Sequence, residues 1–368
     1  MGCKLFYLIR HCPIREHLLT EEDFQHYLED RRRHINASLE SYFKKVLSDV
    51  KDNNMYPIVD MIRSYTMRGG KRVRPILIAA GFELFYGQGD YIYDIATSIE
   101  LAQSFFLIHD DIMDRSDIRR GFPAFHKEME NMLSNVRDRE HLAMSLAIVA
   151  GDLSIDYCYD TIVHSESPPE KKLEALEQIT EIIKITGYGE GLDVYTGSGY
   201  VLKESDLIRL HLRKTAKYTV EGPLMMGARI AGEKDLRELS AYGNLVGLAF
   251  QLHDDIIGTF GTEKEIGKSS KSDVNEGKQT LLIIKALEKS GKEDREFIWK
   301  CLNNGNIDDE DFEKLKDIIV KTGSLDYSRW LIKKFVENGK KRLEKIDGRK
   351  ETKAFLHWFA DYLVTRKN

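Results

Sequence analysis

The sequence predicts an all-α protein, and three observations support this fold class. Only 7 prolines occur in 368 residues. Apolar residues recur at spacings of three and four over long stretches, with charged residues between them, as on the buried face of a helix. Strand signals are weak, because no Asn-Gly or Asp-Gly turn lies between two alternating runs.

The expected helices follow this periodicity along the whole chain. Leu28, Ile35 and Leu39 mark one apolar face near the start, and Ile92 and Ile95 begin another. Segments 114–126 and 258–278 are rich in Gly, Ser and charge, so we expect them to be irregular. The predicted helices span residues 21–51, 55–67, 72–87, 91–113, 137–164, 170–195, 204–231, 234–257, 279–289, 293–303, 309–321, 323–345 and 351–366.

Length and composition exclude several classes of protein. Residues 1–20 are expected to form an N-terminal extension of unknown role, and residues 21–368 a single all-helical domain. The 55 Lys and Arg against 60 Asp and Glu give a net charge of −5, which argues against a nucleic-acid binder. No apolar run approaches the roughly 18 residues that span a bilayer. Four cysteines without Cys-x-x-Cys spacing suggest a reducing, cytoplasmic setting.

Two similar acidic elements each end a long apolar helix. The first runs Asp110-Asp111-Ile112-Met113-Asp114 and the second Asp254-Asp255-Ile256-Ile257-Gly258. Aligned on the aspartate pair, the preceding histidines also match, His109 with His253. Two such helices can face each other across a cavity, as helices that supply metal ligands do in bundles. For both histidines we prefer a core or supporting role over metal binding.

The carboxylates of these elements indicate a hard metal ion. Asp110 and Asp114 are four residues apart, so they share a helix face with Cβ atoms about 5–6 Å apart. Buried carboxylates this close must bind a proton or a cation. Oxygen donors without cysteine suit Mg²⁺, which completes its shell with water or phosphate oxygens. The alternative is that such aspartates merely end helices, but the repeat of the element favours the metal site.

Basic residues lie where diphosphate groups would need them. The run Arg68-Gly69-Gly70-Lys71-Arg72-Val73-Arg74-Pro75 opens a helix, and its glycines permit close approach of the backbone to a ligand. Arg119-Arg120 follows the first acidic element, and arginine binds phosphate in a bidentate manner. Lys268, Lys271 and Lys278 lie in the loop after the second element, as in a lid. Each group alone could be solvated basic residues, and for Lys271 we prefer that interpretation.

In this combination and order, the sequence resembles the trans-isoprenyl diphosphate synthases. The resemblance runs from roughly residue 40 to the C-terminus and implies an isoprenoid-synthase helical bundle around a central cavity that carries out head-to-tail prenyl transfer. The matching residues are Gly69-Gly70-Lys71-Arg72-Val73-Arg74-Pro75, Gln103, Asp110 to Asp114 with Arg119 and Arg120, Lys214-Thr215, Gln251 with Asp254-Asp255, and Gly267-Lys268 through Asp273 to Lys278.

The resemblance also implies a role for each matching residue. Lys71, Arg74, Gln103 and Arg120 would hold the diphosphate of isopentenyl diphosphate. Arg119, Lys214, Gln251 and Lys268 would hold the allylic diphosphate, dimethylallyl or geranyl, with Lys278 nearby. Asp110 and Asp114 would carry two Mg²⁺ ions and Asp254 a third, with Asp111 and Asp255 as the further carboxylates of the metal set. Thr215 would turn its oxygen toward developing positive charge, which places it with Lys214 and Arg119 closest to the chemistry.

Three features depart from the commonest pattern of that family. Gly258 stands in place of the third aspartate of the second element, which leaves Asp254 as the expected direct ligand. Ser269 and Lys271 replace the proline and glycine often seen in the next loop. Glu190 stands where glutamine is common. These departures concern metal and loop geometry, and they leave the expected reaction class unchanged.

The expected reaction needs no protein nucleophile. Mg²⁺ and basic side chains would neutralise the leaving diphosphate, so that the C–O bond ionises. The allylic cation would form in an apolar cavity that excludes water, and the double bond of isopentenyl diphosphate would attack it. A proton is then lost. This scheme agrees with the lack of a Ser-His-Asp or Cys-His arrangement in the sequence.

An aromatic pair is expected to limit product length. Phe105 and Phe106 precede Asp110 by five and four residues, which is roughly 6–7.5 Å along a helix. In the family, such a pair resembles the mark of a farnesyl (C15) synthase, whereas a single aromatic residue goes with the geranylgeranyl product. Phe106 lies nearly on the face of Asp110 and should block the chain more. The alternatives are a geranylgeranyl diphosphate synthase, or rings that only fill the core.

Other functions remain as alternatives. A class I terpene cyclase would need one diphosphate site, so the separate basic run around Lys71 and Arg74 argues against it. A His-Asp phosphohydrolase would need further histidines at matched helix positions. An inactive partner subunit would be expected to lose some of the Asp and Arg positions. The family resemblance also suggests a homodimer, and we expect no nucleic-acid partner and no transmembrane segment.

Overall fold

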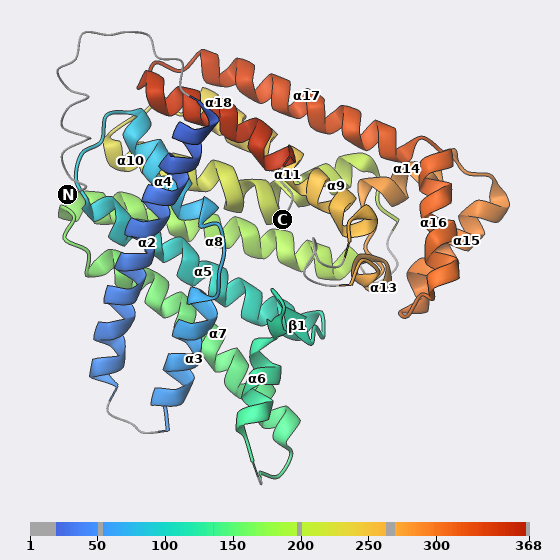
Figure 1. Cartoon of the computed structure of the whole chain (residues 1–368), viewed down its shortest axis with the longest axis horizontal. Helices are drawn as coiled ribbons and strands as arrows, with labels where there is room; N and C mark the ends of the chain where they lie inside the picture. The colour runs from blue at the N-terminus through green and yellow to red at the C-terminus, as the bar shows by residue number, and fades with distance from the viewer. Residues whose placement is uncertain (1–19, 51–53, 135, 197–200, 263–268, 366–368) are drawn as a thin grey trace.

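The computed structural model describes residues 20–50, 54–134, 136–196, 201–262 and 269–365, and it confirms the all-α prediction (Figure 1). The proposed N-terminal extension, apart from residue 20, lies outside the described residues. The helices, in chain order, are α2 (Glu21–Asp49), α3 (Tyr56–Met67), α4 (Val73–Leu84), α5 (Tyr91–Met113), α6 (Phe125–Met132), α7 (Arg139–Val163), α8 (Pro169–Thr196), α9 (Glu204–His211), η1 (Leu212–Glu221), α10 (Gly222–Ala231), α11 (Arg237–Phe260), α13 (Ser272–Asn275), α14 (Leu281–Lys289), α15 (Lys292–Asn304), α16 (Asp309–Lys321), α17 (Ser324–Glu344) and α18 (Lys350–Thr365).

The predicted secondary structure needs correction in three places within the helical part of the chain. The helix expected at 204–231 consists of α9, η1 and α10, and η1 is a π-helix in which the Gly222 N–H bonds the Lys217 carbonyl five residues earlier. The irregular segment expected from residue 258 starts later, because α11 continues to Phe260 and α13 forms within it. Short helix α6 was not predicted, and it begins at the end of the segment expected to be irregular.

A short hairpin follows the first acidic element. Strands β1 (Ile118–Arg119) and β2 (Phe122–Pro123) pair antiparallel, with Arg119 opposite Phe122. The two turn residues, Arg120 and Gly121, have φ of 54° and 76°, as a type I′ turn requires. The sequence rule for hairpins looks for Asn or Asp before Gly, and arginine in the left-handed region is uncommon. The turn was missed for that reason.

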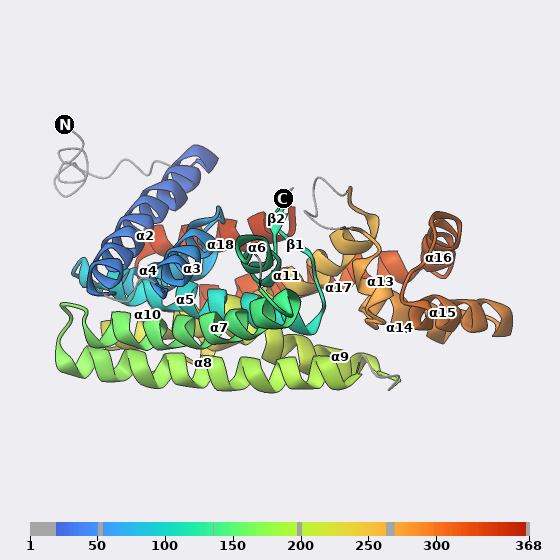
Figure 2. The same cartoon turned by 90° about the horizontal axis from the view of Figure 1, so that it is seen from below.

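The helices that carry the acidic elements lie at the centre of the bundle. Helix α5 packs against α7 and α4, and α11 packs against η1 and α17. Ile95, Ile99 and Ala102 of α5 are fully buried, as are Tyr242 and Val246 of α11. Figure 2 shows α7 and α8 side by side along one face, with α2 toward the opposite face. Both acidic helix ends therefore sit in a scaffold packed on several sides.

Helices α4 and α10 approach each other backbone to backbone. A Cβ on Gly81 would lie 2.2 Å from the Leu224 carbonyl oxygen, and one on Gly227 would lie 1.9 Å from that of Ile78. Only glycine permits such close packing. The contact fixes the middle of α4, the helix that the basic run opens, against α10, which follows η1.

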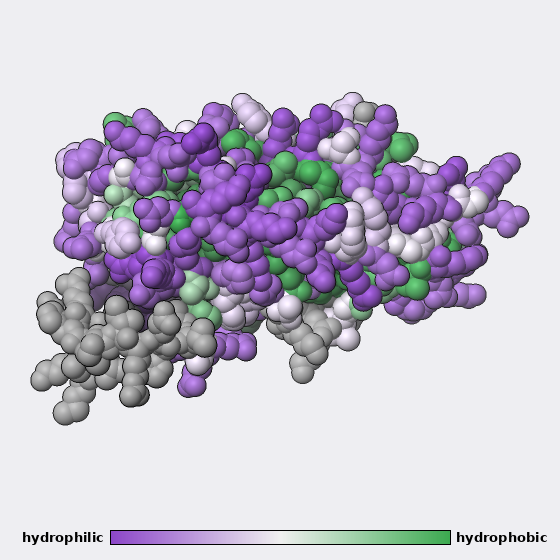
Figure 3. All heavy atoms as spheres, turned by 90° about the horizontal axis from the view of Figure 1, so that it is seen from above, coloured by the Kyte–Doolittle hydropathy of each residue, from purple (hydrophilic) through white to green (hydrophobic). Residues whose placement is uncertain are grey.

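The outer surface differs between two faces of the molecule. Hydrophilic side chains cover most of the face along α17, with hydrophobic ones gathered near its middle (Figure 3). Helix α7, by contrast, is long and apolar enough to cross a membrane by length and composition alone, and 33% of that apolar window is buried inside the protein. Its packing on α5 accounts for the buried part, and Ile148 and Val149 remain exposed.

Candidate active site

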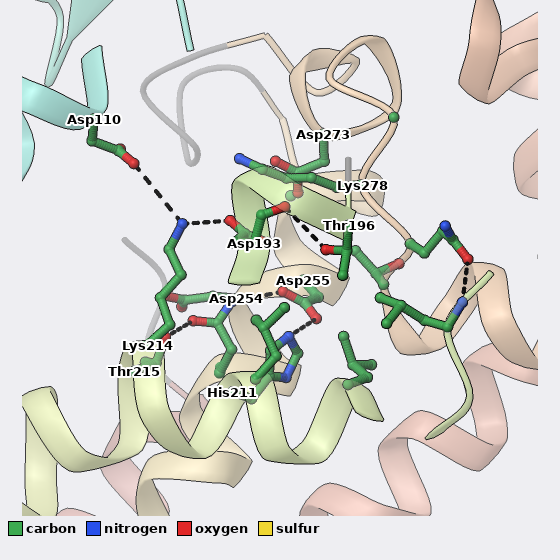
Figure 4. Close-up of a pocket in the computed structure, with 18 of the residues that line it drawn as sticks. Asp110, Asp193, Thr196, His211, Lys214, Thr215, Asp254, Asp255, Asp273 and Lys278 are labelled. Carbon is green, nitrogen blue, oxygen red and sulfur yellow. Dashed lines mark hydrogen bonds and ion pairs between the residues drawn. The ribbon is translucent and has the colours of Figure 1, made fainter. Parts of the chain in front are cut away.

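A cavity of about 310 Å³ lies between α5, α8, η1, α11 and the loop before α14 (Figure 4). We call it the acidic pocket, because carboxylates outnumber cations in its wall. Its charged lining residues are Asp110, Asp193, Asp254, Asp255 and Asp273 with Lys214 and Lys278. Thr215 and Gln251 also line it. The structure thus brings the two acidic helix ends to one cavity, as predicted.

Lys214 is held in the acidic pocket by carboxylates from two helices. Its Nζ lies 2.5 Å from Asp193 and 2.9 Å from Glu190 on α8, and 3.9 Å from Asp110 on α5 (Figure 4). Burial lowers the pKa of Lys214, but Asp193, Asp110 and Glu190 raise it more, so the net shift is upward. Lys214 is therefore a fixed positive charge.

Asp110 and Asp114 lie on successive turns at the end of α5, next to cations. Arg119 Nη2 lies 3.1 Å from Asp110, and Lys278 Nζ lies 3.5 Å from Asp114. Burial raises the pKa of Asp110, but Lys214 and Arg119 outweigh it and the net pKa is lowered. The pKa of Asp114 is raised, mainly by burial. Asp110 is thus the carboxylate that its surroundings keep charged.

The second aspartate of each element is buried and holds a neighbouring polar side chain. Asp111 is fully buried; its Oδ1 accepts from Arg119 Nε at 2.7 Å and its Oδ2 from Tyr65 at 3.1 Å. Asp255 accepts from Gln251 Nε2 at 2.7 Å. Burial, followed by the charge of Asp273, raises the pKa of Asp255 well above its usual range. Metal binding by Asp111 and Asp255 stays a prediction.

The described carboxylates of the acidic pocket are spread out and do not form a compact cluster. Among the described residues, no three His, Cys, Asp or Glu side chains form a group that could hold a metal ion by themselves. Asp110 and Asp254 nevertheless line the same cavity. Asp114 does not line it, but lies 3.5 Å from Nζ of Lys278, which does. Oxygen donors spread in this way suit Mg²⁺, which needs only one or two carboxylates when phosphate oxygens complete its shell.

A second group of polar residues, which we call the arginine cluster, comprises Arg72, Arg74, Arg120 and Gln103. Arg74 donates to Thr219 at 3.0 Å, and its guanidinium lies 4.4 Å from the centre of the Tyr218 ring. Tyr218 donates to Gln103 at 2.8 Å. The pKa of Arg120 is lowered, first by burial and then by the charges of Arg74 and Arg72, although the charge of Glu100 opposes them. Converging cations of this kind favour an anionic ligand.

Arg72 has a structural role that the sequence did not reveal. It is 4% exposed, donates to Asn36 at 3.0 Å and forms an ion pair with Glu100. Its φ of 52° turns the chain into α4. Arg72 therefore ties the basic run to α2 and α5 and leaves Arg74 to face η1. In the sequence it stands between Lys71 and Arg74 with no distinguishing signal.

Three further basic residues were predicted to bind diphosphate, and the structure describes two of them, in different environments. Arg120 lies under the glycine turn, with its Nη1 3.5 Å from where a Cβ on Gly70 would stand, and it donates to the Arg68 carbonyl at 3.1 Å. Lys71 is exposed, with its Nζ 5.9 Å from the centre of the Tyr362 ring. Lys268 lies outside the described residues.

The two phenylalanines point to different neighbours. Phe106 packs edge-on against Tyr218, with ring centres 5.2 Å apart. Phe105 packs against His109 at 4.8 Å. His109 Nε2 lies 3.2 Å from the Ile148 carbonyl of α7, which agrees with a supporting role. Phe106 is thus on the side of α5 that faces η1.

Two of the positions at which the sequence departs from the common family pattern, Gly258 and Glu190, have a structural explanation. A Cβ on Gly258 would lie 2.9 Å from Asp273 Oδ2, so the Asp273 carboxylate occupies the space of a side chain at this position. Glu190 contacts Lys214, and its pKa is raised to about 7, mainly by burial, which Lys214 opposes and Asp110 reinforces. Asp193, Asp273 and His211 also line the acidic pocket, and none was predicted as a site residue.

Comparison with known proteins agrees with this geometry. The polyprenyl synthetase family matches residues 56–319. The chain belongs to this family. It is 32% identical over 340 residues to the geranylgeranyl diphosphate synthase of Sulfolobus acidocaldarius, covering 89% of this chain and 98% of that protein. It is 29% identical to that of Methanosarcina mazei, covering 92% and 97%.

Solved structures of the family share the fold. A geranylgeranyl pyrophosphate synthase from Corynebacterium glutamicum, complexed with isoprenyl diphosphate and magnesium, has a TM-score of 0.84 and 30% identity. The match covers 92% of this chain and 98% of that one. As a polyprenyl synthetase, the protein is a prenyl diphosphate synthase of the trans-prenyltransferase type. The expected isoprenoid-synthase fold is confirmed.

Proposed function

We propose that this polyprenyl synthetase is a Mg²⁺-dependent short-chain synthase that condenses isopentenyl diphosphate with an allylic diphosphate. The observation that carries the proposal is the presence of two separate charged regions, the acidic pocket and the arginine cluster, each of which holds basic side chains. They lie one turn apart along η1, since Lys214 and Thr215 face the first and Tyr218 and Thr219 the second. A cyclase would need one diphosphate site only.

The acidic pocket suits the allylic diphosphate. Mg²⁺ bound by Asp110, Asp114 and Asp254, as three ions when substrate is present, would neutralise the leaving diphosphate and promote its departure. Lys214 and Arg119 supply fixed positive charge at the same place, and Lys278 lies beside Asp114. Lys268, which lies outside the described residues, is proposed to join them.

The arginine cluster suits the diphosphate of isopentenyl diphosphate. Arg74 and Arg120 form no ion pair with a described residue, and Glu100, whose charge acts on Arg120, is already paired with Arg72. An incoming diphosphate would relieve the repulsion between the guanidinium groups. Gln103 lies beside them through Tyr218. Lys71 stands at the exposed edge, where it can meet the same anion. This site needs no metal, because guanidinium groups bind phosphate oxygens directly.

The residues suit a cationic reaction path. The allylic C–O bond breaks and its electron pair leaves with the diphosphate. The double bond of isopentenyl diphosphate then attacks the allylic carbon, and the proton of the adjacent carbon goes to the released diphosphate. Thr215 lines the pocket and would present its oxygen to the positive charge. The preorganised charges of Lys214 and Arg119 act on the departing anion without reorganisation.

Product length is proposed to depend on the aromatic pair. Phe105 and Phe106 lie about one turn before Asp110, where the growing chain would run, which favours farnesyl diphosphate. The relatives named above favour geranylgeranyl diphosphate as the second candidate. Incubation with labelled isopentenyl diphosphate and each allylic primer, followed by chain-length analysis, distinguishes the two. A major product of C20 or longer would overturn the farnesyl assignment, and no condensation at all would overturn the proposed function.

We propose a cytoplasmic location, as the cysteine pattern predicts.

We also propose a homodimer that forms through α7 and α8. Ile148 and Val149 on α7 are 44% and 45% exposed, and Tyr188 on α8 is 62% exposed. A second copy of the chain would cover such apolar side chains. Ile148→Asp with Val149→Asp should give a monomer by light scattering, whereas Trp330→Asp on α17 should not. A wild-type monomer would contradict the proposal.

A further inference from the structure

Asp255 is a buried carboxylate whose contacts indicate a role other than metal binding. It is 6% exposed and lies at the wall of the acidic pocket (Figure 4). Its Oδ1 accepts a hydrogen bond from Nε2 of Gln251, one turn earlier on α11, at 2.7 Å. Oε1 of Gln251 accepts from the Thr215 hydroxyl at 2.6 Å. Two hydrogen bonds in series therefore connect Asp255 on α11 to Thr215 on η1.

The direction of both bonds follows from the chemistry of the carboxylate. Oδ1 of Asp255 accepts a hydrogen bond, so Gln251 turns its NH₂ group toward it and its carbonyl toward Thr215. The other oxygen of Asp255, Oδ2, accepts no hydrogen bond from the described residues and lies 3.7 Å from Nε2 of His211. The Thr215 hydroxyl faces a carbonyl and must donate to it.

This direction decides which part of the Thr215 hydroxyl faces the pocket. Because the hydrogen is committed to Gln251, the lone pairs of Oγ1 are left for the cavity that Thr215 lines. With the Gln251 amide reversed, its NH₂ would donate to Oγ1, and the hydroxyl hydrogen would be free to point into the cavity. A hydroxyl hydrogen would repel an allylic cation, whereas an oxygen lone pair stabilises it.

We propose that Asp255 is a positioning residue that fixes the Gln251 amide and thereby keeps the Thr215 oxygen directed at the allylic cation. The inference rests on the proposed function. A positioning role for Asp255 differs from a metal-binding role in one measurable respect. A metal ligand affects the binding of every diphosphate, whereas this arrangement affects only a ligand that is positive in its hydrocarbon part.

The test compares two inert diphosphates with Mg²⁺ by calorimetry. One is dimethylaminoethyl diphosphate, which carries an ammonium group in its hydrocarbon part, and the other is its uncharged carbon isostere, isopentyl diphosphate. The ratio of their Kd values isolates cation stabilisation, since diphosphate and metal binding cancel. We expect the wild-type protein to prefer the ammonium compound by about tenfold or more. Asp255→Asn removes the constraint on the amide and should lower this preference several-fold.

Asp254→Asn is the matched control on the adjacent residue. It should weaken both compounds together and leave the ratio unchanged. Thr215→Val should abolish the preference, and Thr215→Ser should retain it. Asp255→Leu should act as Asp255→Asn does, with circular dichroism as the check on folding. If Asp255→Asn weakens both compounds equally, as the control does, the proposal is wrong and Asp255 belongs with the metal ligands.

Two further outcomes separate this proposal from the function on which it rests. An unchanged ratio in Thr215→Val would overturn the positioning role even in an enzyme that turns over normally. A wild-type protein that binds neither compound and condenses no substrates would overturn the proposed function itself.

Discussion

The acidic pocket and the arginine cluster balance their charges in opposite ways. In the acidic pocket, each lysine has carboxylate partners: Lys214 contacts Asp193 and Glu190, and Lys278 contacts Asp114. In the arginine cluster, neither Arg74 nor Arg120 forms an ion pair with a described residue; Arg74 is partly buried and Arg120 is exposed. The first region has an excess of negative charge, and the second an excess of positive charge.

This difference indicates how each region would receive a diphosphate. An excess of carboxylates repels an anion unless cations enter with it, so on the proposed function the acidic pocket would need metal ions to receive a diphosphate. An excess of guanidinium groups attracts the anion directly. The proposed function therefore has one region that would depend on divalent metal and one that would not, and each of the following predictions tests or refines that distinction.

The largest effect is expected from removing a carboxylate of the acidic pocket. Asp110→Ala, Asp114→Ala and Asp254→Ala should each lower turnover at least about 10²-fold, the scale of losing one preorganised electrostatic group. EDTA should abolish activity in the unaltered enzyme, and Mg²⁺ should restore it. Full activity in EDTA, or in any of the three variants, would contradict the metal assignment.

The next effect separates the two regions by substrate. Arg74→Ala should raise the KM for isopentenyl diphosphate about 10- to 100-fold, as expected for a hydrogen bond to a charged group, and affect the allylic KM much less. Lys214→Ala should mainly lower kcat or raise the allylic KM. Steady-state kinetics with each substrate varied measures both. Equal effects of both changes on both substrates would remove the distinction between the regions.

A smaller effect is expected where the two regions adjoin. Phe106 packs on Tyr218, which bonds Gln103, so Phe106 lies between the arginine cluster and the path proposed for the hydrocarbon chain. Phe106→Ala should lengthen the main product by at least one C5 unit, and Phe105→Ala should lengthen it less. Chromatography of the hydrolysed products measures this. An unchanged product in both variants would assign the rings to core packing.

The smallest effect concerns the charge balance of the acidic pocket without ligands. Glu190 has its pKa raised from 4.5 to about 7, mainly by burial, so the folded protein binds a proton there more tightly than the unfolded chain. Its contribution to the free energy of unfolding is present below about pH 4.5 and is lost as the pH rises through about 7. The melting temperature of the metal-free enzyme, relative to Glu190→Gln, should fall across this window. If the difference between the two melting temperatures does not change with pH, the raised pKa assigned to Glu190 is wrong.

The sequence predicted the helices better than the contacts of their side chains. Helix α5 has the predicted bounds, because its apolar spacing is regular over 23 residues. Periodicity could not distinguish η1 from an α-helix, since both keep a buried face. The hairpin was missed because Arg120 occupies a turn position that usually takes Asn, Asp or Gly.

The same limit applies within the site. Spacing placed Asp110 and Asp114 on one face, but it could not show that the intervening Asp111 turns into the protein to hold Arg119 and Tyr65. Nor could it identify Glu190 and Asp193, which reach Lys214 from a helix more than twenty residues away in sequence. Such contacts depend on tertiary packing, which motif spacing does not encode.

The π-helical form of η1 has a genetic consequence. Because its hydrogen bonds span five residues instead of four, the segment contains a residue that a regular helix between the same neighbours would not need. Deleting Ala216 or Lys217, which lie between Thr215 and Tyr218, would let the segment close as an α-helix and would change how Tyr218 and Thr219 are turned relative to Lys214 and Thr215. Such a deletion would keep every residue assigned to either region and would still alter the proposed alignment of the two diphosphates.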